Sequence, residues 1–160
     1  MIGREDLIEY VARVQERTRD VVSVIPPELI AWRPAPGEFS LAEIAVHLGN
    51  MRVWNARLAA GEADVRYGGH DARGKETPAA LVAFMEETSK TSLELISNAD
   101  LEAEIGSTMG PIKAWRRVLG GLIEHEVHHR SQLATLLSQN KVLPPALYGI
   151  FVENLPGSRA

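Results

Sequence analysis

Apolar residues recur along most of the chain at the three- and four-residue spacing that places them on one face of an α-helix. Four segments follow this spacing and are predicted to be helices: residues 4–24, 40–60, 77–99 and 111–139. Almost no segment shows the strict alternation of apolar and polar residues that is typical of strands. The pattern therefore predicts an all-α protein, an antiparallel four-helix bundle.

The ends of the predicted helices carry start and stop signals. Ser40 and Glu43 match a capping box, in which each side chain accepts a hydrogen bond from a backbone N–H at the start of the helix. Pro78 follows Thr77 at the first helical position, where proline is favoured. Pro26 ends the first helix because proline cannot continue it.

Three irregular stretches connect these helices, namely residues 26–39, 61–76 and 100–110. The middle one is rich in glycine and polar, and is expected to form a mobile loop over a site. The tail at residues 142–156 is apolar enough to pack on the bundle or on a second subunit, so we expect a packed tail and a homodimer. Because the chain shows no repeat or linker, residues 1–160 are predicted to form one domain with long crossing loops.

Three histidines fall on the apolar stripes of two predicted helices. His47 is in phase with the apolar residues of the second helix, and His125 and His129 are four residues apart, on one face of the fourth. An inward imidazole needs a polar partner because an unpaired buried polar group costs free energy, and one metal ion would be the partner of all three. Three histidine ligands with an open fourth position are typical of a catalytic zinc site.

Nitrogen ligands favour zinc, nickel, copper or iron over calcium or magnesium. We expect one divalent metal ion, with zinc or nickel favoured and iron or manganese as alternatives. The other interpretation is that these are ordinary core or surface histidines with hydrogen-bond partners. The two remaining histidines are expected to be exposed, His70 in a Gly-Gly loop and His128 one residue off the ligand face.

Residues 125–129 also match the H-E-x-x-H pattern of zinc peptidases, in which Glu126 would be the general base. On a helix, however, Glu126 is rotated by about 100° from each of the two histidines. Glu153, in the tail, is the only later acidic residue, and no upstream segment alternates like an edge strand that could hold a peptide. A peptidase is therefore disfavoured, and Glu126 is not expected to be the general base.

The composition excludes several classes of protein. With 17 basic and 21 acidic residues the net charge is −4, which argues against a nucleic-acid-binding surface. The absence of cysteine excludes a cysteine nucleophile and any thiolate ligand. No apolar run approaches the roughly 20 residues of a membrane span, and residues 1–10 are too charged for a secretory signal. A cytoplasmic protein with neither a nucleic acid nor a membrane as partner is expected.

Two segments resemble the DinB-like (YfiT-like) superfamily of metal-dependent enzymes. Residues 32–47, WRPAPGEFSLAEIAVH, are similar to the proline-bearing segment that leads into the family's second helix and ends in its first histidine. Residues 125–133, HEVHHRSQL, resemble the family's H-x-x-x-H-R-G-Q segment, with Ser131 in place of the usual glycine. The resemblance covers most of the chain and implies a four-helix bundle, often a homodimer, with a divalent metal. The ligands that it implies are His47, His125 and His129.

Some members of this family transfer or isomerise with a low-molecular-weight thiol such as bacillithiol or mycothiol. The leading hypothesis is therefore a thiol-dependent S-transferase, or a related transferase, that acts on a small-molecule substrate. The lack of cysteine fits a thiol that is brought in. A metal-dependent hydrolase and a non-catalytic, stress-associated metal-binding protein are the alternatives.

Three further residues are candidates for the pocket of such an enzyme. Trp54 follows His47 at helical spacing and is a candidate for its lining. Arg52 and Arg130 are the cations nearest to the ligands in sequence, and either would bind the carboxylates of a thiol cofactor. For Arg130, pairing with a carboxylate between helices is slightly favoured over that role.

Overall fold

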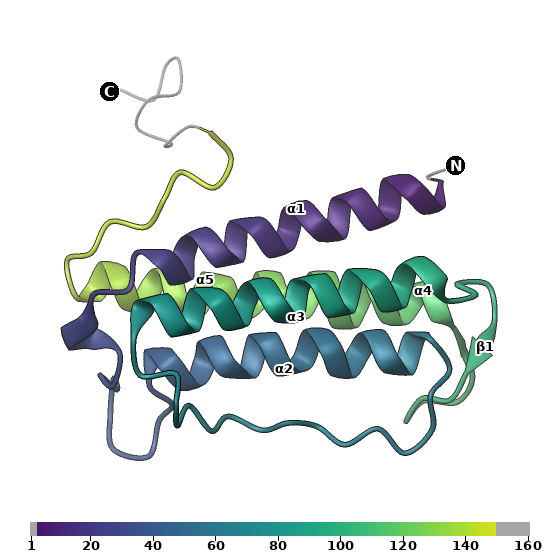
Figure 1. The fold of residues 1–160 in the computed structure, drawn as a ribbon, viewed down its shortest axis with the longest axis horizontal. Helices are drawn as coiled ribbons and strands as arrows, with labels where there is room; N and C mark the ends of the chain where they lie inside the picture. The colour runs from purple at the N-terminus through teal and green to yellow at the C-terminus, as the bar shows by residue number, and fades with distance from the viewer. Residues whose placement is uncertain (1–2, 150–160) are drawn as a thin grey trace.

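The computed structural model describes residues 3–149 and is a bundle of four helical rods (Figure 1). Three rods are single α-helices: α1 (Arg4–Ser23), α2 (Leu41–Ala59) and α3 (Pro78–Asn98). The fourth rod consists of α4 (Ala114–Arg117), the π-helical segment η2 (Val118–Glu124) and α5 (His125–Gln139). None of the helices in the described chain is long and apolar enough to cross a membrane.

Three short elements lie in the connections. They are the 3-10 turn η1 (Pro27–Leu29) and the two-residue strands β1 (Glu104–Ile105) and β2 (Ile112–Lys113). The strands pair in antiparallel fashion between α3 and α4. β1 lies in the stretch that was predicted to be irregular, whereas β2 occupies residues that were predicted to begin the fourth helix. The all-α prediction is confirmed, because the regular elements of the described chain are otherwise helical and include only these two short strands.

The direction of the rods explains the long crossing. In Figure 1, α1 and α5 run towards one end of the bundle, whereas α2 and α3 run towards the other. Because α2 and α3 are parallel, the connection at residues 60–77 has to return along the whole length of α2, and Figure 1 shows it doing so. The bundle therefore has one long crossing, which follows the helix that carries His47.

The predicted starts of α2 and α3 are confirmed. The Glu43 N–H donates to Ser40 Oγ at 3.2 Å, and the Ser40 N–H donates to Glu43 Oε2 at 2.7 Å, which completes the capping box. At the start of α3, the Ala80 N–H donates to Thr77 Oγ1 at 3.2 Å. The start of α2, nearly two turns before His47, is thus fixed by two hydrogen bonds that each satisfy an otherwise unpaired N–H.

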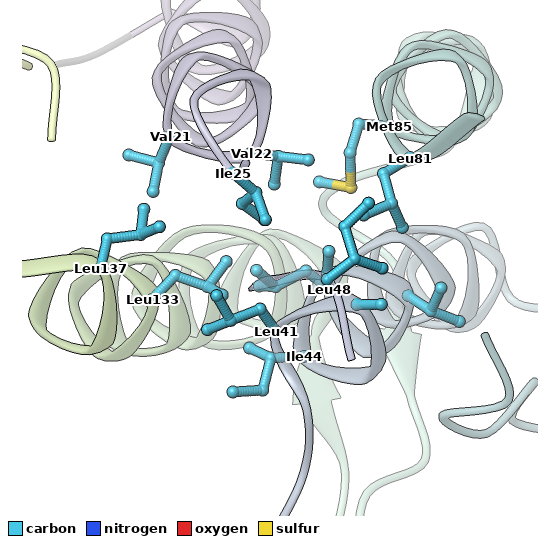
Figure 2. Close-up of a cluster of buried hydrophobic side chains, with 14 of the residues drawn as sticks. Val21, Val22, Ile25, Leu41, Ile44, Leu48, Leu81, Met85, Leu133 and Leu137 are labelled. Carbon is cyan, nitrogen blue, oxygen red and sulfur yellow. The ribbon is translucent and has the colours of Figure 1, made fainter. Parts of the chain in front are cut away.

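The apolar stripes of the four rods meet in a common core (Figure 2). Its fully buried members include Val21, Val22 and Ile25 of α1, Leu41, Ile44 and Leu48 of α2, Leu81 and Met85 of α3, and Leu133 and Leu137 of α5. Each such side chain stabilises the fold by about 1.5–3 kcal/mol relative to an exposed one. This core holds α2 against α5, the two elements that carry the three histidines.

A buried ion pair crosses the middle of the bundle. Arg52 of α2 and Glu126 of α5 are each only 1% exposed. Arg52 Nε donates to Glu126 Oε2 at 2.9 Å, and Arg52 Nη2 donates to Glu126 Oε1. The same guanidinium donates to the carbonyl oxygens of Met85 at 2.8 Å and Gln15 at 3.0 Å. One side chain therefore connects all four rods.

The fourth rod differs from the prediction of one α-helix from residue 111. It begins at Ala114, and η2 interrupts it directly before His125. η2 contains two adjacent glycines, each of which weakens an α-helix by about 1 kcal/mol relative to alanine. Asn55 Nδ2 of α2 donates to the Gly121 carbonyl at 3.2 Å, which gives the backbone a side-chain partner at this point. Such π-helical segments are frequent at functional sites.

Alanine substitutions at the two adjacent glycines are expected to have opposite effects. A Cβ atom at Gly121 would overlap the amide of Asn55, whereas one at Gly120 would meet no atom within 4 Å. Gly121→Ala should therefore destabilise the protein by about 1–3 kcal/mol. Gly120→Ala should stabilise it by up to about 1 kcal/mol, because alanine favours a helical backbone. Urea unfolding of both variants tests this, and equal effects would contradict it.

The described part of the tail only partly packs on the bundle. Val142 and Leu147 pack against the core, whereas Leu143 is 74% and Tyr148 70% exposed. Residues 150–156 of the predicted tail lie outside the described residues. The homodimer stays a prediction, and the two exposed apolar side chains are surface that a second subunit would cover.

Candidate metal centre

The three histidines meet between α2 and the first turns of α5. His47 Nε2 lies 3.1 Å from His125 Nε2 and 3.2 Å from His129 Nε2. One ring nitrogen from each residue lies within 4.8 Å of the other two. All three side chains are half-buried, so the cluster opens to the surface on one side. The sequence prediction that these residues share one place is therefore matched by the geometry.

The spacing of the nitrogens suits a metal ion. Zinc–nitrogen bonds of 2.0–2.1 Å in a tetrahedral arrangement place two ligand nitrogens about 3.3 Å apart. His129 Nδ1 lies 2.9 Å from Gln132 Oε1, an oxygen that can only accept, so this Nδ1 carries the proton and Nε2 carries the lone pair. A cation would offset the repulsion between lone pairs that point at one another. The cluster could hold one metal ion.

The electrostatics of the cluster keep the rings neutral. Burial, followed by the neighbouring imidazoles, lowers the pKa of His47 to about 3 and the pKa of His125 to about 4. Burial also lowers the pKa of His129. At pH 7 the three imidazoles are therefore in the neutral form that binds metal ions.

Two side chains of the α2–α3 crossing contact His47. The Tyr67 hydroxyl is hydrogen-bonded to His47 Nδ1, and burial raises the pKa of Tyr67 to about 12, so that the hydroxyl stays protonated. The His70 ring stacks on His47 at 4.5 Å between centroids, and on Phe39 at 4.1 Å on its other side. The expectation that His70 is exposed to solvent is wrong, because these two rings half-bury it.

The crossing is attached to α2 along its length. Asn50 Nδ2 donates to the Gly69 carbonyl at 2.9 Å, and Trp54 Nε1 donates to the Val65 carbonyl at 3.0 Å. The Trp54 ring lies 6.4 Å from the Tyr67 ring in an edge-on arrangement. Trp54, a predicted pocket residue, therefore contacts Tyr67, which in turn contacts His47.

The two arginines predicted to meet a cofactor face the middle of the bundle instead. Arg52 pairs with Glu126, and Arg130 is buried and donates to the Val14 carbonyl at 3.1 Å. The reason is their position on the helix. The Arg52 side chain, five residues after His47, is rotated by about 140° from it around the helix axis, and the Arg130 side chain is rotated by about 100° from that of His129. The expectation that either lines the pocket is therefore wrong. Arg130 does join two helices, but through a backbone carbonyl rather than a carboxylate.

A different arginine lies beside Trp54. Arg117, at the end of α4, places its Cζ 5.9 Å from the centroid of the Trp54 ring. Its Nε is buried without a hydrogen-bond partner in the part of the chain that the structure describes. Sequence reasoning missed this residue, because the eight residues between Arg117 and His125 correspond to about 2.2 turns of an α-helix and do not place the two side chains on one face.

Glu126 of the H-E-x-x-H pattern belongs to the buried ion pair and not to the histidine cluster. Both carboxylate oxygens of Glu126 accept hydrogen bonds from Arg52 in the interior, so this group does not face the histidine cluster. This supports the prediction that Glu126 is not a general base. His128 is exposed on the surface, as predicted.

The chain belongs to the DinB superfamily, whose sequence model matches residues 10–133, a range that includes the three histidines. Among solved structures, the chain is similar to a DinB-like protein of Bacillus subtilis, YjoA, with a TM-score of 0.70 and 16% identity. That match covers 88% of this chain and 96% of the other, and at such low identity it shows the shared fold alone. A comparison with curated proteins found no match.

Proposed function

We propose that the protein is a metal-dependent enzyme that transfers a low-molecular-weight thiol to a small electrophilic substrate. The observation that carries this proposal is the convergence of three neutral, half-buried imidazoles, which leaves a fourth position for an exogenous ligand. Zinc or nickel is the preferred metal, with iron or manganese as alternatives. A bound divalent metal would supply a Lewis acid that lowers the pKa of the thiol.

The protein side chains would bind and orient the two reactants. His47, His125 and His129 hold the metal, and the Tyr67 ring forms a wall of the site on the side of the α2–α3 crossing. The thiolate sulfur forms a carbon–sulfur bond with the electrophile while the leaving group departs with its bonding electron pair. The chain has no cysteine of its own, so the sulfur comes from the cofactor.

The proposed chemistry is tested by a screen of electrophiles against several thiols. Purified protein should conjugate at least one electrophile, and the rate should fall to the uncatalysed level after chelation or in His47→Ala. If the metal-loaded protein instead hydrolyses substrates without a thiol, the hydrolase alternative replaces the transferase. If neither activity is found although metal is bound, the protein is a non-catalytic metal-binding bundle.

Arg117 is proposed to bind a carboxylate of the thiol, in place of the two arginines buried in the core. Its buried Nε lacks a partner in the described chain, and Trp54 and Tyr67 connect it to His47. Losing a hydrogen bond to a charged group costs about 1.5–3 kcal/mol. Arg117→Met should therefore raise the KM for a carboxylate-bearing thiol by at least about tenfold.

Cysteamine, a thiol without a carboxylate, is the matched control, and its KM should not change in Arg117→Met. The exposed neighbour Arg116 provides a second control, because Arg116→Met should leave both KM values unchanged. Equal increases for both thiols in Arg117→Met would show that Arg117 only supports the fold of the site.

A further inference from the structure

We propose that two residues of the α2–α3 crossing, Tyr67 and His70, are positioning residues that hold His47 in the orientation needed to bind the metal. This inference rests on the metal centre of the proposed function and adds a second layer of residues to it. Sequence reasoning treated the crossing as a mobile, polar loop. Two of its side chains instead contact a single imidazole, that of His47.

The His47 ring is held at its edge and on one face. Its Nε2 points at the other two histidines, while its Nδ1 is hydrogen-bonded to the Tyr67 hydroxyl. One face is covered by His70, whose ring is within 1° of parallel, and Phe39 supports His70 from behind at an angle of 4°. Rotating His47 would therefore break the hydrogen bond and the stack together.

The hydrogen bond also fits the tautomer of His47 that binds a metal ion through Nε2. A neutral imidazole that binds metal through Nε2 carries its proton on Nδ1 and must donate it. The Tyr67 oxygen is placed to accept a hydrogen bond from that N–H, as Gln132 Oε1 does for His129 at 2.9 Å. The partner of a ligating histidine's second nitrogen typically changes metal affinity by about 10–100-fold.

His70 is a stacking partner and not a fourth ligand in this arrangement. Ligand lone pairs lie in the plane of their ring, and the planes of His70 and His47 are parallel and separated. The nitrogens of His70 therefore do not point at the place where those of His47, His125 and His129 converge. His70 is also not part of the group whose nitrogens lie within 4.8 Å of one another.

The backbone of the crossing lies close to α2 at the point between these two side chains. Between them lie Gly68 and Gly69, and the Gly69 carbonyl accepts a hydrogen bond from Asn50 of α2. A Cβ atom at Gly68 would lie 2.7 Å from Cγ of the Asn50 side chain, and Gly69 has a φ of +79°, where side chains are disfavoured. The two glycines allow the backbone to approach α2 closely enough for Tyr67 and His70 to reach His47.

The experiment measures metal affinity by competition between the intact protein and a chromogenic chelator, with zinc as the probe. Tyr67→Phe should weaken binding by about 10–100-fold. Tyr10→Phe is the matched control because Tyr10 is exposed on α1, and its affinity should equal that of the wild type. His70→Ala should weaken binding, whereas His70→Phe, which preserves a stacking ring without a nitrogen, should restore it.

The outcomes separate the inference from the proposed function. If the wild type binds zinc but Tyr67→Phe binds it equally well, the positioning role is wrong and the metal centre stands. If His70→Phe loses as much affinity as His70→Ala, and the cobalt-loaded variants show one nitrogen ligand fewer, His70 is a ligand and its stacking role is wrong. If the wild type binds no metal, both proposals fail. Circular dichroism of each variant checks that the helical content is unchanged.

Discussion

Replacing Glu126 with glutamine is expected to destabilise the protein by about 3–5 kcal/mol, because it leaves the Arg52 guanidinium as an uncompensated charge in the interior. Both side chains are 1% exposed, so water cannot replace the lost carboxylate. A loss of this size is a large fraction of the total stability of a single domain. The measurement is the free energy of unfolding in urea.

Two controls separate the ion pair from a general effect of the substitution. Glu124→Gln, two residues earlier on the same rod and exposed, should change stability by less than about 0.5 kcal/mol. The double variant Arg52→Met with Glu126→Leu removes both charges, and it should be less destabilised than either single variant. A folded Glu126→Gln protein of wild-type stability that had lost a peptidase activity while keeping its metal would instead support the H-E-x-x-H interpretation.

Alanine at any one of His47, His125 and His129 is expected to weaken metal binding by more than about 100-fold, the upper end of what the loss of a ligand's hydrogen-bond partner costs. Each residue supplies one of three nitrogens, and two nitrogens do not hold a divalent ion firmly at a surface that is open to water. The measurement is elemental analysis of each variant purified without added metal.

His128 supplies the matched control for this prediction. It lies next to His129 on the same helix but is exposed, so His128→Ala should retain wild-type metal content. Unchanged metal content in all three ligand variants would remove the candidate site, and equal losses in all four variants would point to non-specific binding by surface histidines.

The helices and the histidine cluster could be predicted from the sequence because they depend on local periodicity. Leu41, Ile44 and Leu48 repeat at helical spacing, and His47 shares a helix with them. Four-residue spacing alone places His125 and His129 on one face. The packing of two apolar stripes against each other then brings the three imidazoles together, as expected from their phase.

Features that depend on contacts between distant segments were missed. The partner of Arg52 lies 74 residues away, so proximity to His47 in sequence suggested a pocket cation where helical phase places a core ion pair. His70 is half-buried because His47 of α2 and Phe39 of the preceding connection stack on it, and nothing in a Gly-Gly loop indicates that. The π-helical segment likewise depends on Asn55 of a neighbouring helix as well as on the two glycines.

The most direct test of the metal-dependent thiol chemistry is the absorption spectrum of the cobalt-loaded protein during titration with a low-molecular-weight thiol. We expect cobalt bands of a site with three nitrogen ligands, and a new sulfur-to-cobalt charge-transfer band that grows to one thiol per chain. His125→Ala should show neither. A cobalt spectrum that no thiol alters would contradict an open position for the thiol. Failure of the wild-type protein to take up cobalt at all would contradict the metal centre itself.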